Sequence, residues 1–375
     1  MSKQILGILT ATLALGLVLS GCAGVAPEGD PANSGGADSA DVKAAEAVVS
    51  EYTGQPSAFP VTEPLAVLPA GARIAFMDCG SPICALFGDL IKEPAGELGM
   101  TVTSIEAGTT ADGAAAAFDT VLEGGYDGVI VVGLAPSLWA RELEELNAAD
   151  IKIVTTGIDG IEPESVVATG HGGPGNYVGG EIMASWVVAD SGGSADSVYF
   201  KTPEISASEA SARGYVSQME TICPDCSVEV IDIPVSQFGA GGAQIAVDYL
   251  IANPDTRYAV FAIGEQAGGL PAAMRAADVT DVKTMLYAPD PSVLAGIKSG
   301  DFTAGVGLDL PTMVWTMVDS MARGVTDQPI DQLVLDEAIP RQILTADDLD
   351  GDLSAGWSGY PDFADRFNAL WADAK

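Results

Sequence analysis

Polar and aromatic side chains recur in the loops that follow apolar, strand-like runs of this sequence, and these are the residues that could bind a ligand. They carry carboxylate, amide, hydroxyl or aromatic groups, and the set is Asp78, Ser81, Asp159, Asn176, Phe238, Glu265, Asp290 and Asp309. Carboxylates and amides bond to hydroxyl groups, and an aromatic face covers a C–H surface. The set therefore suits a small, hydroxyl-rich ligand. For any single residue the alternative is a helix cap or a solvated loop end.

Groups suited to catalysis are few. The chain has one histidine, His171, in the loop-like stretch Gly170-His171-Gly172-Gly173-Pro174. A lone loop histidine is more often structural than a general base. No nucleophile elbow, phosphate-binding loop or dinucleotide fingerprint accompanies it. The sequence therefore predicts a binding protein without a cofactor or metal ion, and not an enzyme.

The cysteines divide into one single residue and two close pairs. Of the five, Cys79 lies near Cys84 and Cys223 near Cys226, while Cys22 stands alone. In an exported chain, close pairs in even number favour two disulfides. Two alternatives remain open, a zinc site made by four cysteines and a redox-active Cys-Pro-Asp-Cys at 223–226.

The first 22 residues have the pattern of an export signal. Lys3 precedes an apolar run from Ile5 to Leu19, and Ser20-Gly21-Cys22 follows. The run is too short to span a bilayer comfortably, and the small residues are typical of a cleavage site. Small residues followed directly by cysteine resemble a bacterial lipobox, which implies cleavage after residue 21 and a lipid on Cys22. An ordinary signal peptide cut elsewhere is the alternative.

Charge and composition limit the partners. The chain has 52 acidic and 16 basic residues, a net charge of −36. Such a surface repels nucleic acid and anionic lipid head groups, so a nucleic-acid role is excluded. Residues 23–40 are mostly small or polar and predict a flexible tether. A short helix at 41–52 and a proline-rich approach complete the segment 22–69.

From residue 70 onward, apolar strands alternate strictly with amphipathic helices. This alternation predicts an α/β fold with parallel sheets covered on both faces. It starts again after residue 172 and supplies too many elements for one compact sheet. We therefore expect two doubly wound lobes joined by a multi-strand hinge. The N-terminal lobe comprises 70–172 plus 310–335, and the C-terminal lobe comprises 173–309 plus 336–375.

Several motifs of these units resemble the ribose-binding type of periplasmic binding protein, which serves sugar ABC transporters and has the type I fold. The resemblance covers roughly residues 70–335. Its motifs are Arg213-Gly214-Tyr215, Asn176-Tyr177-Val178-Gly179-Gly180, Ala262-Ile263-Gly264-Glu265, Ala295 to Gly300, and Leu310-Pro311. The resemblance implies two lobes that close over a ligand and then dock on a membrane permease.

The chain departs from that family where the ligand would bind. Glu265 replaces the usual Asp, and Ser211 stands where a sugar-binding Arg is common. Ala288 takes the place of a ligand-binding Asp, with Asp290 two residues on, and Asp309 falls where Gln is common. The resemblance therefore implies the fold but not ribose specificity. The missing Arg and the extra acids favour a polyol, an unusual sugar or a cationic ligand.

Together these features predict a lipid-anchored, extracytoplasmic and monomeric solute-binding protein. Its expected ligand is a small polar molecule, a sugar or polyol, and its expected partner an ABC permease. One alternative is a binding protein that presents its ligand to a membrane receptor. Others are an extracellular enzyme using His171 or the acids, and a thiol oxidoreductase using Cys223 and Cys226.

Overall fold

A computed structural model describes residues 40–56, 58–335 and 339–375. Contacts separate residues 1–35 from 36–375, and all described residues belong to the second unit. The predicted signal peptide, Cys22 and residues 23–39 of the tether lie outside the described residues. Within the described ranges, no helix combines the length and apolar character needed to cross a membrane.

The first lobe is built on a five-stranded sheet with the order β2-β1-β3-β4-β5, in which every pairing is parallel. Its strands are β1 (Arg73–Asp78), β2 (Thr101–Glu106), β3 (Gly128–Val132), β4 (Lys152–Thr156) and β5 (Ala168–Thr169). Side chains alternate between the faces of a strand. Ile74 and Phe76 of β1 therefore enter one apolar core, while Ala75 and Met77 enter another.

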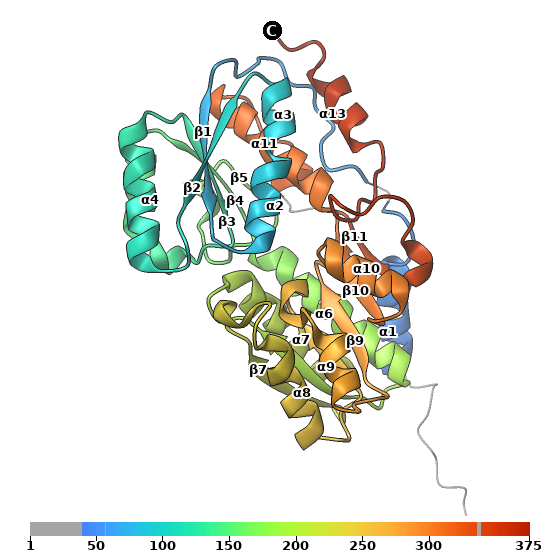
Figure 1. The fold of residues 1–375 in the computed structure, drawn as a ribbon. Coiled ribbons are helices and arrows are strands. Elements are labelled where there is room, and N and C mark those ends of the chain that lie inside the picture. The colour runs from blue at the N-terminus through green and yellow to red at the C-terminus, as the bar shows by residue number, and fades with distance from the viewer. Residues whose placement is uncertain (1–39, 57, 336–338) are drawn as a thin grey trace, which may run out of the picture. The chain divides into compact units, whose positions relative to one another are not determined.

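Helices cover both faces of this sheet, as a parallel sheet requires. One face carries α2 (Pro82–Leu90), α3 (Lys92–Glu97), α11 (Leu310–Val325) and α13 (Phe363–Trp371), and the other carries α4 (Ala111–Gly124) and α5 (Ala140–Ala148). Figure 1 shows α4 on one side of the strands and α2 with α11 on the other. The single helix expected over 83–98 is two helices. Pro94 lacks an N–H and would crowd the carbonyl of Leu90, where α2 ends.

The second lobe is built on a six-stranded sheet with the order β11-β10-β9-β8-β6-β7. Its strands are β6 (Asp196–Lys201), β7 (Ser227–Asp232), β8 (Tyr258–Phe261), β9 (Lys283–Tyr287), β10 (Ala304–Leu308) and β11 (Arg341–Leu344). The strands pair in parallel except for β11, which joins β10 antiparallel. The predicted pair of lobes with largely parallel sheets is confirmed.

Helices again cover both faces of the second sheet. One face carries α1 (Ala40–Glu51), α6 (Gly173–Ser191) and α7 (Ser206–Ile222), and the other carries α8 (Gly242–Ala252), α9 (Leu270–Ala276) and α10 (Pro291–Ser299). The short elements are α12 (Gln332–Leu335) and the 3-10 turns η1 (Pro136–Leu138), η2 (Pro163–Ser165), η3 (Val235–Gln237), η4 (Gly264–Ala267) and η5 (Ala346–Asp348). Cys223 follows the end of α7, as expected, and is bonded to Cys226.

Both terminal segments cross from one lobe to the other. Helix α1 packs on the second lobe, and the Tyr52 carbonyl accepts from the Ile343 N–H of β11 at 2.8 Å. The chain then reaches the first lobe, where the Leu65 N–H donates to the Leu370 carbonyl at 2.9 Å. The C-terminal segment likewise runs from β11 to α13. The described residues 339–375 therefore do not lie wholly in the C-terminal lobe, to which 336–375 was assigned from the sequence.

A buried ion pair on α11 bonds to both terminal segments and holds them against the first lobe. Asp319 Oδ2 accepts from Arg323 Nε at 2.6 Å, and both side chains are 2% exposed. Asp319 Oδ1 also accepts from Trp371 Nε1 at 2.8 Å, while Arg323 donates to the Glu63 carbonyl. Removing either side chain would leave the other buried without an opposite charge, which is destabilising.

Helices α6 and α7 approach each other closely at two glycines. A Cβ on Gly180 would collide with the Ser211 carbonyl, and one on Gly214 would collide with the Tyr177 carbonyl. The colliding atoms belong to the backbone and cannot rotate away. Glycine is therefore required at both positions for this helix contact, which covers one face of the second sheet.

We expect Gly180→Ala and Gly214→Ala each to destabilise the protein by roughly 1–3 kcal/mol, because the added methyl group overpacks the contact. Thermal unfolding measures the effect. Gly96→Ala is the matched control, since Gly96 is an exposed helical glycine with nothing within 4 Å of the added Cβ. The control should be neutral or stabilising by at most about 1 kcal/mol. Equal effects in all three variants would contradict this account.

Candidate functional site

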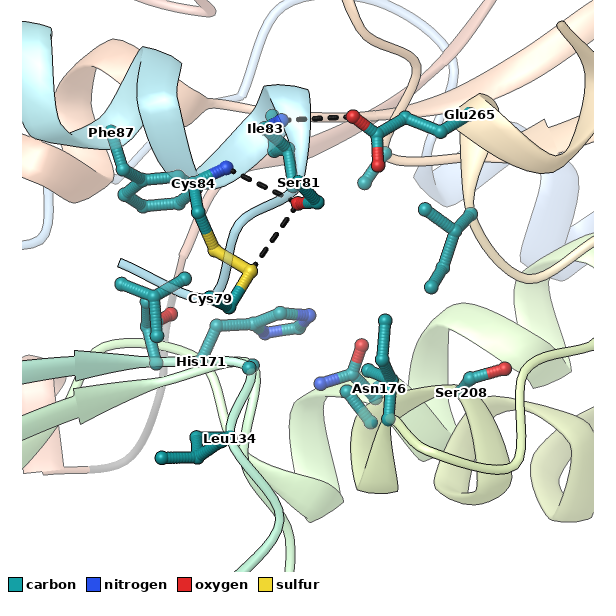
Figure 2. A pocket seen from close by; sticks show the side chains of 18 of the residues that line it. Cys79, Ser81, Ile83, Cys84, Phe87, Leu134, His171, Asn176, Ser208 and Glu265 are labelled. Carbon is teal, nitrogen blue, oxygen red and sulfur yellow. Dashed lines mark hydrogen bonds between the residues drawn. A yellow bond between two sulfur atoms is a disulfide. The ribbon is translucent and has the colours of Figure 1, made fainter. Parts of the chain in front are cut away.

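A cavity lies at the carboxyl ends of the strands of both sheets, where open α/β sheets bind ligands. The space there that is open to water-sized molecules is about 130 Å³. Figure 2 shows side chains from both lobes turned toward it. Loops after β1, β3 and β4 supply one wall, and loops after β6, β7 and β8 with the starts of α6 and α7 supply the other.

The wall from the first lobe is mostly apolar. The loop between β1 and α2 is closed by a disulfide from Cys79 to Cys84, and Ser81 caps α2 by accepting from the Cys84 N–H at 3.4 Å. Aliphatic and aromatic side chains complete this wall, among them Ile83, Phe87, Leu134, Leu138 and Met313. None of the described residues lining this wall carries a charge.

The wall from the second lobe carries two carboxylates. Glu204 follows β6, and Glu265 lies in η4 after β8; because these strands are neighbours, the two loops share one edge of the sheet. Asn176 and Ser208 also line the cavity, but both side chains bond within the protein. Asn176 donates to the Gly172 carbonyl at 2.7 Å, and Ser208 accepts from the Thr202 N–H at 2.8 Å.

Glu265 connects the two lobes. Its Oε1 accepts from the Ile83 N–H at the start of α2, at 2.8 Å (Figure 2). An anion at a helix N-terminus is favourable because the amide dipoles point toward it. Burial nevertheless raises the pKa of Glu265 to about 7, against the opposing effect of the Ile83 N–H and with a further contribution from Asp290. Ionising Glu265 at neutral pH therefore costs free energy in this state.

Two carboxylate oxygens of the cavity have no hydrogen-bond partner among the described residues. They are Glu204 Oε2 and Glu265 Oε2, and both are buried. A buried acceptor without a donor costs about 1–3 kcal/mol, and more if it is charged. Both side chains line the cavity, so these oxygens are candidate acceptors for a ligand with donor groups.

His171 lies at the crossing between the lobes, and its ring is tied to the second lobe. Its Nδ1 lies 3.1 Å from Arg341 Nη2, and its Nε2 lies 2.8 Å from the Tyr287 hydroxyl. Because a guanidinium can only donate, Nδ1 is the acceptor, and Nε2 carries the proton and donates to Tyr287. Burial, together with the charge of Arg341, lowers the pKa of His171 well below its usual range. His171 is therefore a neutral, structural residue.

Three of the eight predicted ligand-binding residues line the cavity: Ser81, Asn176 and Glu265. Phe238 and Asp290 line a neighbouring hollow together with Glu265, and Asp290 also caps α10 by accepting from the Ser292 N–H at 2.7 Å. The structure therefore brings Phe238 and Asp290 close to the cavity without placing them in its wall. Their roles in binding stay predictions.

The other three predicted residues bond elsewhere. Asp78 accepts from the Gly80 N–H at 2.8 Å, and Asp159 forms an ion pair with Arg213 across the two lobes at 2.8 Å. Asp309 is buried, caps α11 through the Thr312 N–H at 3.0 Å and also accepts from the Gly359 N–H at 2.9 Å. Burial raises the pKa of Asp309 to about 6.

Glu204 and Tyr287 line the cavity but were not among the predicted site residues. Glu204 does follow an apolar run, so its position carried the same signal as that of Glu265. Among the described residues no group of His, Cys, Asp or Glu could hold a metal ion. The four cysteines that allowed a zinc site are instead joined as Cys79–Cys84 and Cys223–Cys226.

We expect His171 to take up its proton only at a pH well below 6.5, where an exposed histidine titrates. The chain has one histidine, so ¹³C-histidine labelling of untagged protein gives one imidazole signal to follow by NMR. The urea-unfolded chain is the control and should titrate near 6.5. Because only the unfolded state takes up this proton, the site lowers the free energy of unfolding as the pH falls below about 6.5. A folded-state midpoint near 6.5 would contradict the assignment.

Comparison with known proteins identifies the family. The family model described as a periplasmic binding protein domain matches residues 73–328. None of the curated proteins matches the chain. Among solved structures, a glucose–galactose binding protein from Geobacillus stearothermophilus is 17% identical, has a TM-score of 0.64, and the match covers 74% of this chain and 99% of that chain.

Two further structures show the same fold. The periplasmic binding protein component of the arabinose ABC transporter from Shewanella sp. ANA-3 is 16% identical, with a TM-score of 0.63 and coverage of 80% of this chain and 95% of that chain. An ABC transporter solute-binding protein from Agrobacterium vitis, solved with bound allitol, is also 16% identical, with a TM-score of 0.63 and coverage of 74% and 96%.

The family consists of extracytoplasmic binding proteins and not of enzymes. The matched region contains both walls of the cavity, from Cys79 to Met313. The chain therefore belongs to the periplasmic binding protein family and has the type I fold of its sugar-binding members, as the sequence predicted.

Proposed function

We propose that this protein captures a sugar or polyol in the cavity between its lobes and delivers it to an ABC importer. The observation that carries the proposal is the pair of unsatisfied carboxylate oxygens on the second-lobe wall. Sugar hydroxyls donate hydrogen bonds that would satisfy them. The apolar wall opposite would cover the C–H face of the ring.

Closure of the lobes is the proposed signal to the importer. The bond from Ile83 to Glu265 and the pair of Asp159 with Arg213 both join one lobe to the other. The Asp159 pair is largely exposed and contributes little by itself. A ligand that contacts both walls stabilises only the closed form. It therefore shifts the population of the protein toward that form.

The proposal includes a lipid anchor at Cys22, and a monomer as the working form. An anchored protein stays near its membrane partner, which raises its effective concentration there. The permease would meet the closed lobes, whose surface changes when the ligand binds.

We expect sugars or polyols to raise the thermal unfolding temperature of residues 23–375, because a ligand that binds only the folded state stabilises it. A concentration about a hundred times the dissociation constant gives roughly 2.7 kcal/mol. Val235→Trp should abolish the shift by filling the cavity from a partly exposed position. Val67→Trp is the matched control, since Val67 is 45% exposed and lies outside the cavity wall. If no sugar or polyol shifts the parent, the substrate class is wrong.

We expect Cys22→Ser to abolish incorporation of a labelled fatty acid and to release the protein from the membrane fraction of its bacterial host. The thioether to the lipid forms at the cysteine sulfur, which serine lacks. The double variant Cys223→Ser with Cys226→Ser is the control, because it also replaces cysteine by serine but should keep the label. Fatty-acid label that persists in Cys22→Ser would disprove the anchor.

A further inference from the structure

The charge of the cavity is confined to one wall and has one sign. Of the described residues that line it, only Glu204 and Glu265 carry an ionisable acid, and none is Lys or Arg. His171 also lines the cavity, but its Nδ1 accepts from Arg341, so the ring is neutral. A ligand bound here meets negative charge on the second-lobe wall and no side-chain cation to balance it.

The unsatisfied carboxylate oxygens should bind a cationic group of the ligand more tightly than a neutral hydroxyl. Glu204 Oε2 and Glu265 Oε2 are both buried without a partner among the described residues. A hydroxyl donates one hydrogen bond and leaves the charge of the carboxylates uncompensated. An ammonium group has three donors and a positive charge, and its hydrogen bonds to carboxylates are about twice as strong as neutral ones.

The opposite wall limits how many hydroxyl groups the ligand can carry. Ile83, Phe87, Leu134, Leu138 and Met313 face the cavity from the first lobe. A hydroxyl buried against such side chains without a partner costs about 1–3 kcal/mol. A ligand that fits must therefore have a C–H surface on this side and its donors on the other.

We propose that the ligand is an aminodeoxy sugar or aminodeoxy polyol, in which a protonated amine replaces a hydroxyl and lies against Glu204 and Glu265 of the second lobe. The C–H face of the ligand then packs on Ile83, Phe87 and Leu134 of the first lobe. This inference rests on the proposed function and narrows its substrate class. Anionic sugars such as sugar phosphates and uronic acids are disfavoured, because the carboxylates of Glu204 and Glu265 repel an anion when they are ionised.

The buried state of Glu265 supports this assignment. Its pKa is raised to about 7 because burial disfavours the charged form. An ammonium beside it would favour the ionised carboxylate, so binding would release a proton when the free protein is protonated. Affinity for an amine should therefore fall as the pH is lowered from about 7.5 to about 5.5.

The experiment compares three matched sets by calorimetry and thermal shift: D-glucosamine, D-galactosamine and D-mannosamine, each with its parent hexose and its N-acetylated form. N-acetylation keeps an N–H but removes the charge. We expect at least one amine to bind about tenfold or more tightly than its parent and its N-acetyl form, since only the amine brings a positive charge to the carboxylates. The comparison uses residues 23–375, which include every described residue.

Variants test the assigned carboxylates. Glu204→Gln and Glu265→Gln should each reduce the preference for the amine about tenfold, and Glu265→Gln should remove its pH dependence. Glutamine keeps an acceptor for the Ile83 N–H, so the contact between lobes can persist. Glu144→Gln on α5 is the control, because Glu144 is exposed and outside the cavity wall. Unfolding temperatures without ligand show whether each variant folds.

The outcomes separate this inference from the proposed function. If a hexose or its N-acetyl form binds as tightly as the amine, the amine assignment is wrong while sugar binding stands. The same holds if the preference for the amine survives in both glutamine variants. If none of the sugars, amines or polyols binds, the proposed function fails together with the inference.

Discussion

The parallel arrangement of both sheets is the constraint on which the rest of this structure depends. Parallel strands need crossover connections, and these place helices on both faces of each sheet. The carboxyl ends of the parallel strands then lie at one edge of each sheet, and polar loop residues gather there. With two such sheets, the edge of β6 and β8 brings Glu204 and Glu265 to a cavity whose other wall begins after β1.

The buried carboxylate oxygens that lack hydrogen-bond donors in the described part of the chain lie in that cavity. Elsewhere, buried charges have partners, as Asp319 has Arg323 and Trp371, and Asp309 has several donors. Glu265 has one donor, from the opposite lobe, and its second oxygen has none among the described residues. Burying this carboxylate oxygen without a donor costs free energy in the ligand-free protein, and a bound ligand would supply the donor. Ligand binding would therefore favour closure.

The sequence predicted the fold well because the signals for it are local. Apolar runs bounded by turns marked the strands. Strand β5 escaped notice because it has only two residues, and β11 because its four residues begin with the polar Arg341 and Gln342. Site residues were harder to predict. A carboxylate after a strand also precedes a helix, so Asp290 and Asp309 had the position of ligands and serve as caps. Which carboxylate turns inward depends on packing between distant segments, and sequence spacing does not encode that.

The crossing of both terminal segments has a consequence for the entropy of closure. Helix α1 is packed on the second lobe while Leu65 is bonded in the first, and the C-terminal segment makes the same crossing from β11 to α13. Each additional chain segment that connects the two lobes restricts how far they can separate. The open form then has fewer possible arrangements. These connections therefore lower the entropy that the two lobes lose when a ligand closes them. They lie outside residues 73–328, the region that matches the family model.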